Sequence, residues 1–321
     1  MSEDQKQPFD FMGLRKIASV ISIALVVVSI ALLAVRGLNY GMDFTGGTSV
    51  EFEYAEAPDL ADIRATLREA GYEQFVVQNF GSDTTVLIRM AEAGNDTLAR
   101  QVTEALKSEG EALVLISSEF IGSQVGEQLK EDSGLGLLIA LLVVLLYVGM
   151  RFQFKFGIAS VLPLGHDVII ILGVFSLFQW TFDLTVLAAL LAVIGYSLND
   201  TIIIADRIRE NFRRIRVGEP WEIINQSVHE TIGRTVNTSG TTLVVLLALY
   251  FLGGEAINNF AIALIIGVVV GTYSSIYVSA NLLIVFGVTR EDLMVPAKEG
   301  AADSSEEEEP ARVVEPDVIP V

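Results

Sequence analysis

The sequence contains no cysteine and only two histidines among 321 residues, and these scarcities exclude several chemistries. Without cysteine the chain has neither disulfide bonds nor thiolate metal sites. Two histidines without an H-E-x-x-H motif make an intramembrane hydrolase a poor fit. The glycine-rich stretch at residues 41–48 lacks the lysine of a Walker motif, so it is not a phosphate-binding loop. We therefore expect neither enzymatic activity nor a bound cofactor or metal.

Basic residues are also scarce, with 21 Lys and Arg against 40 Asp and Glu and a formal net charge of −19. The acidic excess lies in two blocks. Residues 36–133 carry 7 basic and 18 acidic side chains, and residues 290–321 carry 3 and 10. Neither block is typical of a nucleic-acid-binding surface. We expect the second block, with four consecutive glutamates at 306–309, to be a disordered tail.

Apolar residues are abundant and gather in long runs. They make up 51% of the chain, and the mean hydropathy of +0.52 is above that of an ordinary soluble domain. Six runs are long enough to cross a bilayer as helices: residues 17–35, 134–150, 157–180, 184–205, 235–252 and 256–286. The first is longer than the apolar part of a signal peptide and no cleavage site follows it, so we interpret it as a retained anchor.

The positive residues predict the orientation of the spans. Residues 1–16, Arg151 and the arginines within segment 206–234 fall on one side, whereas the turns at 181–183 and 253–255 have no Lys or Arg. By the positive-inside rule both termini are cytoplasmic, and the segment between the first two spans faces outward. This describes a multi-pass membrane protein whose residues 134–289 hold spans two to six.

Residues 36–133 have the pattern of a small α/β domain. We expect strands at 49–53, 75–77, 85–88 and 112–117, and helices after the capping residue Asp59 and at 96–108. The order strand, helix, strand, strand, helix, strand is that of a ferredoxin-like domain. The predicted fold is therefore six transmembrane α-helices with a periplasmic ferredoxin-like α/β insert between helices 1 and 2. Nothing in the insert looks catalytic.

The span at 184–205 contains a carboxylate, Asp200, preceded by Asn199. A charge at this depth costs about 2.5–3.5 kcal/mol on insertion scales, so it usually faces a bundle interior and marks an ion or proton path. Ser197 lies one helical turn before Asp200 on the same face and offers a hydroxyl. The alternative is a structural hydrogen bond or ion pair inside the bundle.

A second polar pair, His166 and Asp167, lies in the third span. Together they have the chemistry of a proton relay. Alternatively, they satisfy each other or a nearby backbone group and position a kink at Pro163. The sequence favours neither interpretation.

The fifth span begins at Arg234 and continues through a Thr-, Ser- and Asn-rich stretch. Asn237 and Thr241, like other pairs four residues apart, form polar stripes suited to hydrogen bonds between helices or to a wet path. Arg234 could approach Asp200 and stabilise its charged form, or it could be an ordinary positive-inside arginine. Residues 219–232, with apolar residues at helical spacing, predict an amphipathic helix in the membrane interface.

Several glycines and one helix-capping residue also predict local structure. Gly267 and Gly271 allow close helix packing in the last span, and Asp183 is placed to cap the helix that carries Asp200. In the stretch GMDFTGGT at 41–48 the glycines permit a sharp turn into the first strand of the insert.

Four blocks of this sequence, in order, resemble the SecF family, the smaller membrane subunits of the SecDF accessory complex of the Sec translocon. They are GMDFTGGTSVEF, PLGHDVIIILG, VIGYSLNDTIIIADRIREN and RTVNTSGTTLVVLLALYFLGG. The resemblance, closest to the Gram-negative form, extends from about residue 9 to about residue 290 and leaves out only the acidic tail. SecF is similar to one half of a resistance-nodulation-division transporter, and SecD supplies the other half.

The resemblance implies that the chain works with SecD and uses the proton motive force to complete the translocation of preproteins. It implies Asp200 as the proton-path carboxylate, Arg234 as its partner, and Asp43, Gly46 and Gly47 as the turn that leads into the periplasmic domain. The implied partners are SecD, the SecYEG channel, YajC, YidC and the translocating preprotein, with protons as the coupling ion. A subunit of a proton-coupled small-molecule exporter is the alternative.

Overall fold

The computed structural model describes residues 9–73, 75–90, 96–107, 113–151, 154–254 and 257–289. Within them, six helical stretches are long and apolar enough to cross a membrane. They are α1 (Arg15–Arg36, after the short turn η1 at Met12–Leu14), α5 (Ser123–Arg151), α6 (Phe154–Phe178), α7 (Leu184–Arg214), α8 (Pro220–Leu252), and a last stretch made of α9 (Asn258–Tyr273), the π-helical η3 (Ser274–Ser279) and α10 (Ala280–Val285). The six predicted spans are confirmed. The predicted disordered tail lies outside the described residues.

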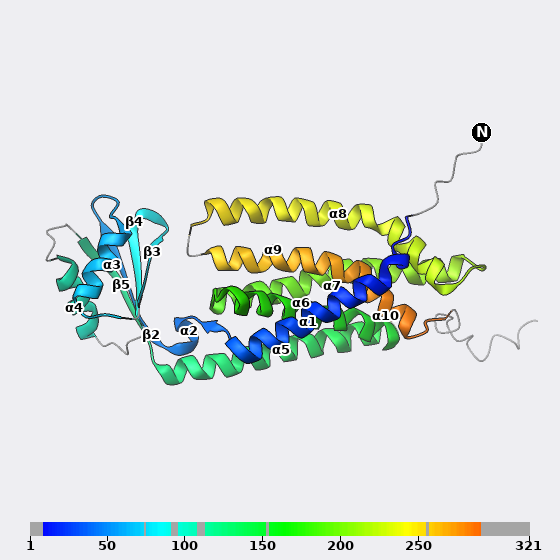
Figure 1. Ribbon diagram of the computed structural model, residues 1–321, viewed down its shortest axis with the longest axis horizontal. Coiled ribbons are helices and arrows are strands. Elements are labelled where there is room, and N and C mark those ends of the chain that lie inside the picture. The colour runs from blue at the N-terminus through cyan, green and yellow to red at the C-terminus, as the bar shows by residue number, and fades with distance from the viewer. Residues whose placement is uncertain are drawn as a thin grey trace, which may run out of the picture.

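The six helical stretches lie side by side along the long axis, with the insert at one end and the described start of the chain at the other (Figure 1). Helices α6, α7 and α9 are the most buried of the bundle. Helices α1 and α5 expose large apolar side chains such as Val20 and Leu138. An apolar outer surface around a more enclosed centre is what a membrane-spanning bundle requires, because lipid takes the place of water outside it.

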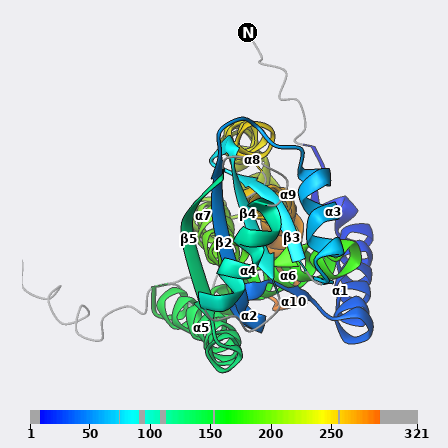
Figure 2. The same ribbon diagram turned by 90° about the vertical axis from the view of Figure 1, so that its left-hand side faces the viewer.

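The insert is the predicted ferredoxin-like domain. Its elements are β2 (Gly47–Tyr54), α3 (Leu60–Glu69), β3 (Phe75–Phe80), β4 (Ser82–Met90), α4 (Asp96–Lys107) and β5 (Leu113–Ile121). The strands form one antiparallel sheet in the order β3-β4-β2-β5. Apolar residues of α3 and α4, among them Leu67 and Val102, share a core with Phe52 and Ile88 of the sheet. Figure 2 looks along the bundle from this end and shows the sheet in front of the helices.

Two short elements that the sequence pattern did not predict join the insert to the bundle. Strand β1 (Asn39–Tyr40) pairs in parallel with β6 (Thr181–Phe182), which connects α6 to α7. The four-residue helix α2 (Met42–Thr45) follows β1. Helix α5 begins at Ser123, directly after β5, and so starts well before the predicted span at residue 134. The insert is therefore held to the bundle by secondary structure on both of its connections.

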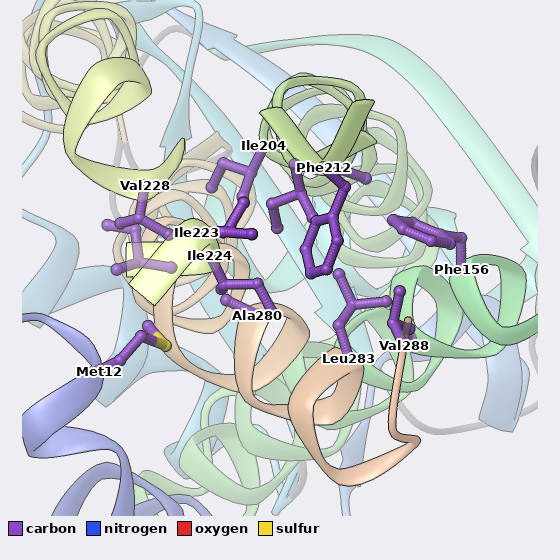
Figure 3. Close-up of a cluster of buried hydrophobic side chains, with 14 of the residues drawn as sticks. Met12, Phe156, Ile204, Phe212, Ile223, Ile224, Val228, Ala280, Leu283 and Val288 are labelled. Carbon is purple, nitrogen blue, oxygen red and sulfur yellow. The ribbon is translucent and has the colours of Figure 1, made fainter. Parts of the chain in front are cut away.

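The prediction of a separate interfacial helix at residues 219–232 is wrong. This segment is the first part of α8, which continues without a break to Leu252. Its apolar residues Ile224 and Val228 are fully buried and lie in one apolar cluster with Ile204 and Phe212 of α7 (Figure 3). The amphipathic pattern was real, but its apolar face packs on the extended end of α7 instead of on lipid.

Candidate functional site

Asp200 lies inside the bundle, on the face of α7 that packs against its neighbours. Its side chain is 1% exposed, and Oδ2 has no hydrogen-bond partner among the described residues. Ser239 and Arg234, both on α8, lie near enough to act on the carboxyl group electrostatically. A buried carboxylate with one unsatisfied oxygen is costly in a bundle interior, so it is a candidate functional group.

Arg234 approaches Asp200 from α8, as one of the two interpretations of the sequence proposed. The two residues form no direct ion pair, so the attraction acts at longer range. The arginine is exposed and contributes to the wall of an open pocket of about 490 Å³ that it shares with Arg207 and Glu230. Arg234 is therefore placed between a solvent-accessible pocket and the buried carboxylate.

His166 and Asp167 form a contact of their own. His166 Nδ1 lies 2.9 Å from Asp167 Oδ1, and the hydroxyls of Ser197 and Ser274 donate to Asp167 Oδ2 at 2.7 and 2.8 Å. Asp167 thus joins α6, α7 and the π-helical η3. Ser197 donates to this carboxylate and not to Asp200, and the hydroxyl residue that lies near Asp200 is Ser239 on α8.

The close packing predicted at Gly267 and Gly271 is confirmed. A Cβ atom at Gly271 would lie 3.0 Å from Ser197 Oγ and 3.5 Å from Asp167 Oδ2. A Cβ atom at Gly267 would overlap the side chain of Val193 on α7. Because both glycines lack a side chain, α9 comes close to α7 and, at Gly271, to α6 as well, where Ser274 reaches Asp167.

The polar stretch of α8 behaves differently from the predicted stripes. Thr241 donates to the backbone oxygen of Asn237, and Thr238 and Thr242 likewise bond carbonyls of their own helix. Ser239 does reach another helix, because its hydroxyl lies 2.7 Å from that of Thr272 on α9. Thr272 was missed by the sequence analysis, and its only signal was a polar residue directly after Gly271.

Asn199 is not brought into this site. Although it precedes Asp200 in sequence, its side chain is exposed on the outer face of α7. Consecutive residues on a helix are about 100° apart, and on α7 this rotation carries Asn199 to the outer face while Asp200 and Thr201 lie inside.

The glycine-rich turn lies at the opposite end of α7 from its basic residues. Gly46 and Gly47 have φ values of 76° and 147°, which confirms that glycine is needed for the turn. Asp43, on α2, accepts a hydrogen bond from the backbone nitrogen of Leu184 at 3.0 Å. Asp183 caps the same helix as predicted, accepting from Val186 at 3.0 Å.

The family models that match this chain cover the four sequence blocks described above. The family model of the C-terminal part of the protein export membrane proteins SecD/SecF matches residues 101–289, and the SecD/SecF GG motif matches residues 31–57. The protein translocase subunit SecF of Pseudomonas aeruginosa is 47% identical over 92% of this chain and 96% of its own. The SecF subunit of Escherichia coli O157:H7 is 43% identical over 94% and 95%.

The chain belongs to the SecF family. Among solved structures, SecDF from Thermus thermophilus, a translocon-associated membrane protein, is 35% identical with a TM-score of 0.76. The likeness covers 89% of this chain and 40% of the SecDF chain, so this chain spans well under half of that protein. The described residues contain six helices that are long and apolar enough to cross a membrane, and the family consists of export membrane proteins. The chain is therefore a multi-pass membrane protein.

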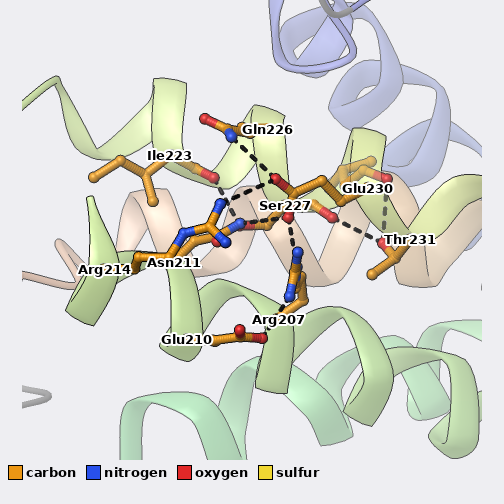
Figure 4. A network of polar contacts seen from close by, with 10 residues as sticks. Arg207, Glu210, Asn211, Arg214, Ile223, Gln226, Ser227, Glu230 and Thr231 are labelled. Atoms are coloured by element: carbon orange, nitrogen blue, oxygen red, sulfur yellow. Dashed lines mark hydrogen bonds and ion pairs between the residues drawn. The ribbon is translucent and has the colours of Figure 1, made fainter.

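A polar network that the sequence analysis missed fastens α7 to α8 beyond Asp200 (Figure 4). Glu230 is its centre: its carboxylate accepts from Arg207, Asn211 and Gln226 at 2.5, 2.9 and 3.0 Å. Asn211 also donates to Ser227 at 3.0 Å. From the sequence alone these arginines indicated only the topology, because their partner Glu230 lies on another helix. In this SecF-family chain the basic end of α7 is thus also a structural element.

Proposed function

We propose that this SecF-family chain, together with SecD, uses the proton motive force to complete the translocation of preproteins across the bacterial inner membrane. The observation that carries the proposal is Asp200, a carboxylate that is 1% exposed in the middle of a membrane-spanning helix with Arg234 nearby. Ionisable groups at such positions are rare, and they mark ion and proton pathways.

In this mechanism Asp200 takes up a proton and releases it to the opposite side of the membrane. Protonation removes its charge from the bundle interior and ends the attraction to Arg234. The balance between two packings of α7 and α8 then shifts, because the two protonation states favour different arrangements. One charge crossing the full potential supplies about 2.3 kcal/mol per 100 mV, so repeated cycles are needed to move a chain.

The Asp167 cluster extends the proposed path. Ser197 and His166 both contact Asp167, and Ser197 precedes Asp200 by one helical turn. His166 Nε2 is buried and has no hydrogen-bond partner among the described residues. A proton that reaches Asp167 can pass along these hydrogen bonds, and the ring nitrogen of His166 offers it a further position.

A second membrane subunit is part of the proposal. Asn199, Asn237 and Thr241 are exposed on the membrane-spanning parts of α7 and α8. Polar groups in lipid are costly, so this face is suited to another protein such as SecD. We also propose the SecYEG channel, YajC, YidC and the preprotein as partners. We propose in addition that both termini lie in the cytoplasm and the insert outside, as the basic residues predict.

The test replaces Asp200 by asparagine, which keeps shape and hydrogen bonding but cannot titrate. Vesicles containing the chain and SecD are assayed for proton flux and for the late, proton-driven stage of preprotein export. We expect both to be lost, whereas Asp206→Asn, which neutralises an exposed carboxylate on the same helix, retains both. Normal export by Asp200→Asn at full membrane potential contradicts the proposal. If a small-molecule drug drives proton flux in these vesicles and Asp200→Asn causes no export defect, the small-molecule exporter is favoured.

A further inference from the structure

Three segments far apart in sequence meet where the insert joins the bundle. The chain enters the insert through β1 and α2, leaves it through the start of α5, and returns between α6 and α7 through β6. The backbone nitrogen of Gly41 donates to Phe182 O at 2.8 Å, next to the paired strands β1 and β6. The start of α7 is therefore built into the connection between the insert and the bundle.

Asp43 adds a contact that helix α7 does not need for its own cap. Asp183 already caps it, accepting from Val186 and from the Thr185 hydroxyl. Asp43 takes up a further free N–H group, that of Leu184, from a position 141 residues away in sequence. Its negative charge also lies at the positive end of the helix dipole, where carboxylates are favoured.

On the side of the insert, α2 has little freedom to move independently. A Cβ atom at Gly46 would lie 2.8 Å from the backbone of Ser123 at the start of α5, and one at Gly47 would overlap the backbone oxygen of Met90 in β4. Phe44 stacks on Phe182 with ring centres 5.7 Å apart. A displacement of α2 must therefore displace the sheet and α5 with it, because such close backbone contacts transmit strain.

We propose that Asp43 is the positioning residue that couples α7 to the outer domain. Asp200 follows Leu184 on the same unbroken helix, about 24 Å along its axis. A movement of α7 that starts at Asp200 thus reaches the insert through the Asp43 carboxylate. This inference rests on the proposed function, in which the protonation of Asp200 moves α7.

The experiment measures the distance between insert and bundle directly. The chain has no cysteine, so Glu69→Cys on α3 and Leu252→Cys at the outer end of α8 give a unique pair of spin labels. The labelled chain is reconstituted with SecD, and pulsed electron spin resonance records the distance distribution with Asp200 present and with Asp200→Asn. Export is measured on the same preparations.

With Asp43 intact, we expect Asp200→Asn to shift the distribution. With Asp43→Ala, we expect a broader distribution, no shift and loss of export, while proton binding at Asp200 is retained. Loss of one hydrogen bond to a charged group corresponds to an increase of about tenfold in the uncoupled population. Asp43→Asn keeps an acceptor oxygen without the charge and should fall between wild type and Asp43→Ala.

The matched control is Asp59→Ala, which removes a cap of the same chemistry inside the insert, where Asp59 accepts from Ala61 at 2.7 Å. It should leave the shift and export unchanged. If Asp43→Ala has the distance distribution of wild type, with the same width and the same shift on Asp200→Asn, the inference is wrong. If Asp43→Ala does not fold, the same result in Asp43→Asn overturns the inference. If Asp200→Asn causes neither a shift nor an export defect, the proposed function fails, while the width in Asp43→Ala still decides whether Asp43 joins the two parts.

Discussion

Replacing Asp167 by alanine tests how much a buried polar cluster stabilises this bundle. The substitution removes the acceptor of three contacts, from His166, Ser197 and Ser274, at 2.7–2.9 Å. Two of them join different helices. In soluble proteins hydrogen bonds to charged groups are worth about 1.5–3 kcal/mol each, whereas between membrane helices they average about 0.6 and reach about 1.7 kcal/mol.

The membrane values give about 1–3.5 kcal/mol for the two serine bonds. With the histidine contact added, we expect Asp167→Ala to lower the free energy of unfolding by about 2–5 kcal/mol. Asp167→Asn retains one acceptor oxygen and should lose about half as much. Reversible unfolding in mixed micelles, followed by circular dichroism, measures these differences.

Thr201→Val is the matched control. The Thr201 hydroxyl is buried on α7 without a partner among the described residues, so its removal should leave stability unchanged or raise it. If Asp167→Ala has the same free energy of unfolding as Thr201→Val, Asp167 does not stabilise the junction of α6, α7 and η3. A loss well above about 5 kcal/mol would show instead that this site behaves like the interior of a soluble protein.

Two further predictions concern the proton site and the orientation of the chain. If Arg234 and Asp200 act on one step, the double variant Arg234→Ala with Asp200→Asn should export no less than Asp200→Asn alone, and Arg234→Lys should retain partial function because it keeps the charge without the planar fork. Additive defects in cold-sensitive, export-dependent growth would assign Arg234 an independent role. Protease added to spheroplasts should cleave within the insert and leave Arg207–Arg216 intact, because the basic segment is predicted to lie in the cytoplasm. Cleavage at the arginines in intact spheroplasts would reverse the topology.

Local features of the fold were predictable from the sequence because their causes are local. Asp59 and Asp183 were recognised as caps by their place before apolar helices, and both accept the expected backbone hydrogen bonds. The strand and helix order of the insert followed from residue periodicity. Asp200 was found because a carboxylate within an apolar run is conspicuous at the level of composition alone.

The error at α8 has a definite physical reason. From the sequence, residues 219–232 were assigned to an interfacial helix and a separate span was begun at Arg234. The hydroxyls of Thr231, Thr238 and Thr242 instead donate to carbonyls of the preceding turn, so polar residues are accommodated without ending the helix.

Contacts between distant segments could not be predicted at all. The bonds from Ser274 to Asp167 and from Leu184 to Asp43 each join residues more than a hundred positions apart. No periodicity records such a pairing, because it depends on how closely the helices pack. The glycines that permit that packing were visible in the sequence, but their partners were not.

The π-helical η3 sets the rotational phase between the two halves of the last span. A turn closed by bonds to the fifth residue holds one residue more than an α-helical turn, which rotates everything after it by about 100°. In a regular helix Leu283 would point about 120° away from Gly271, and with the extra residue it points within about 20° of it. Gly271 packs against Ser197 of α7, and Leu283 lies in the apolar cluster with Ile204 of the same helix. The wide turn thus keeps Gly271 and Leu283 on one side of the last span, which faces α7 at α9 and η3 and packs on α6 and α8 at α10.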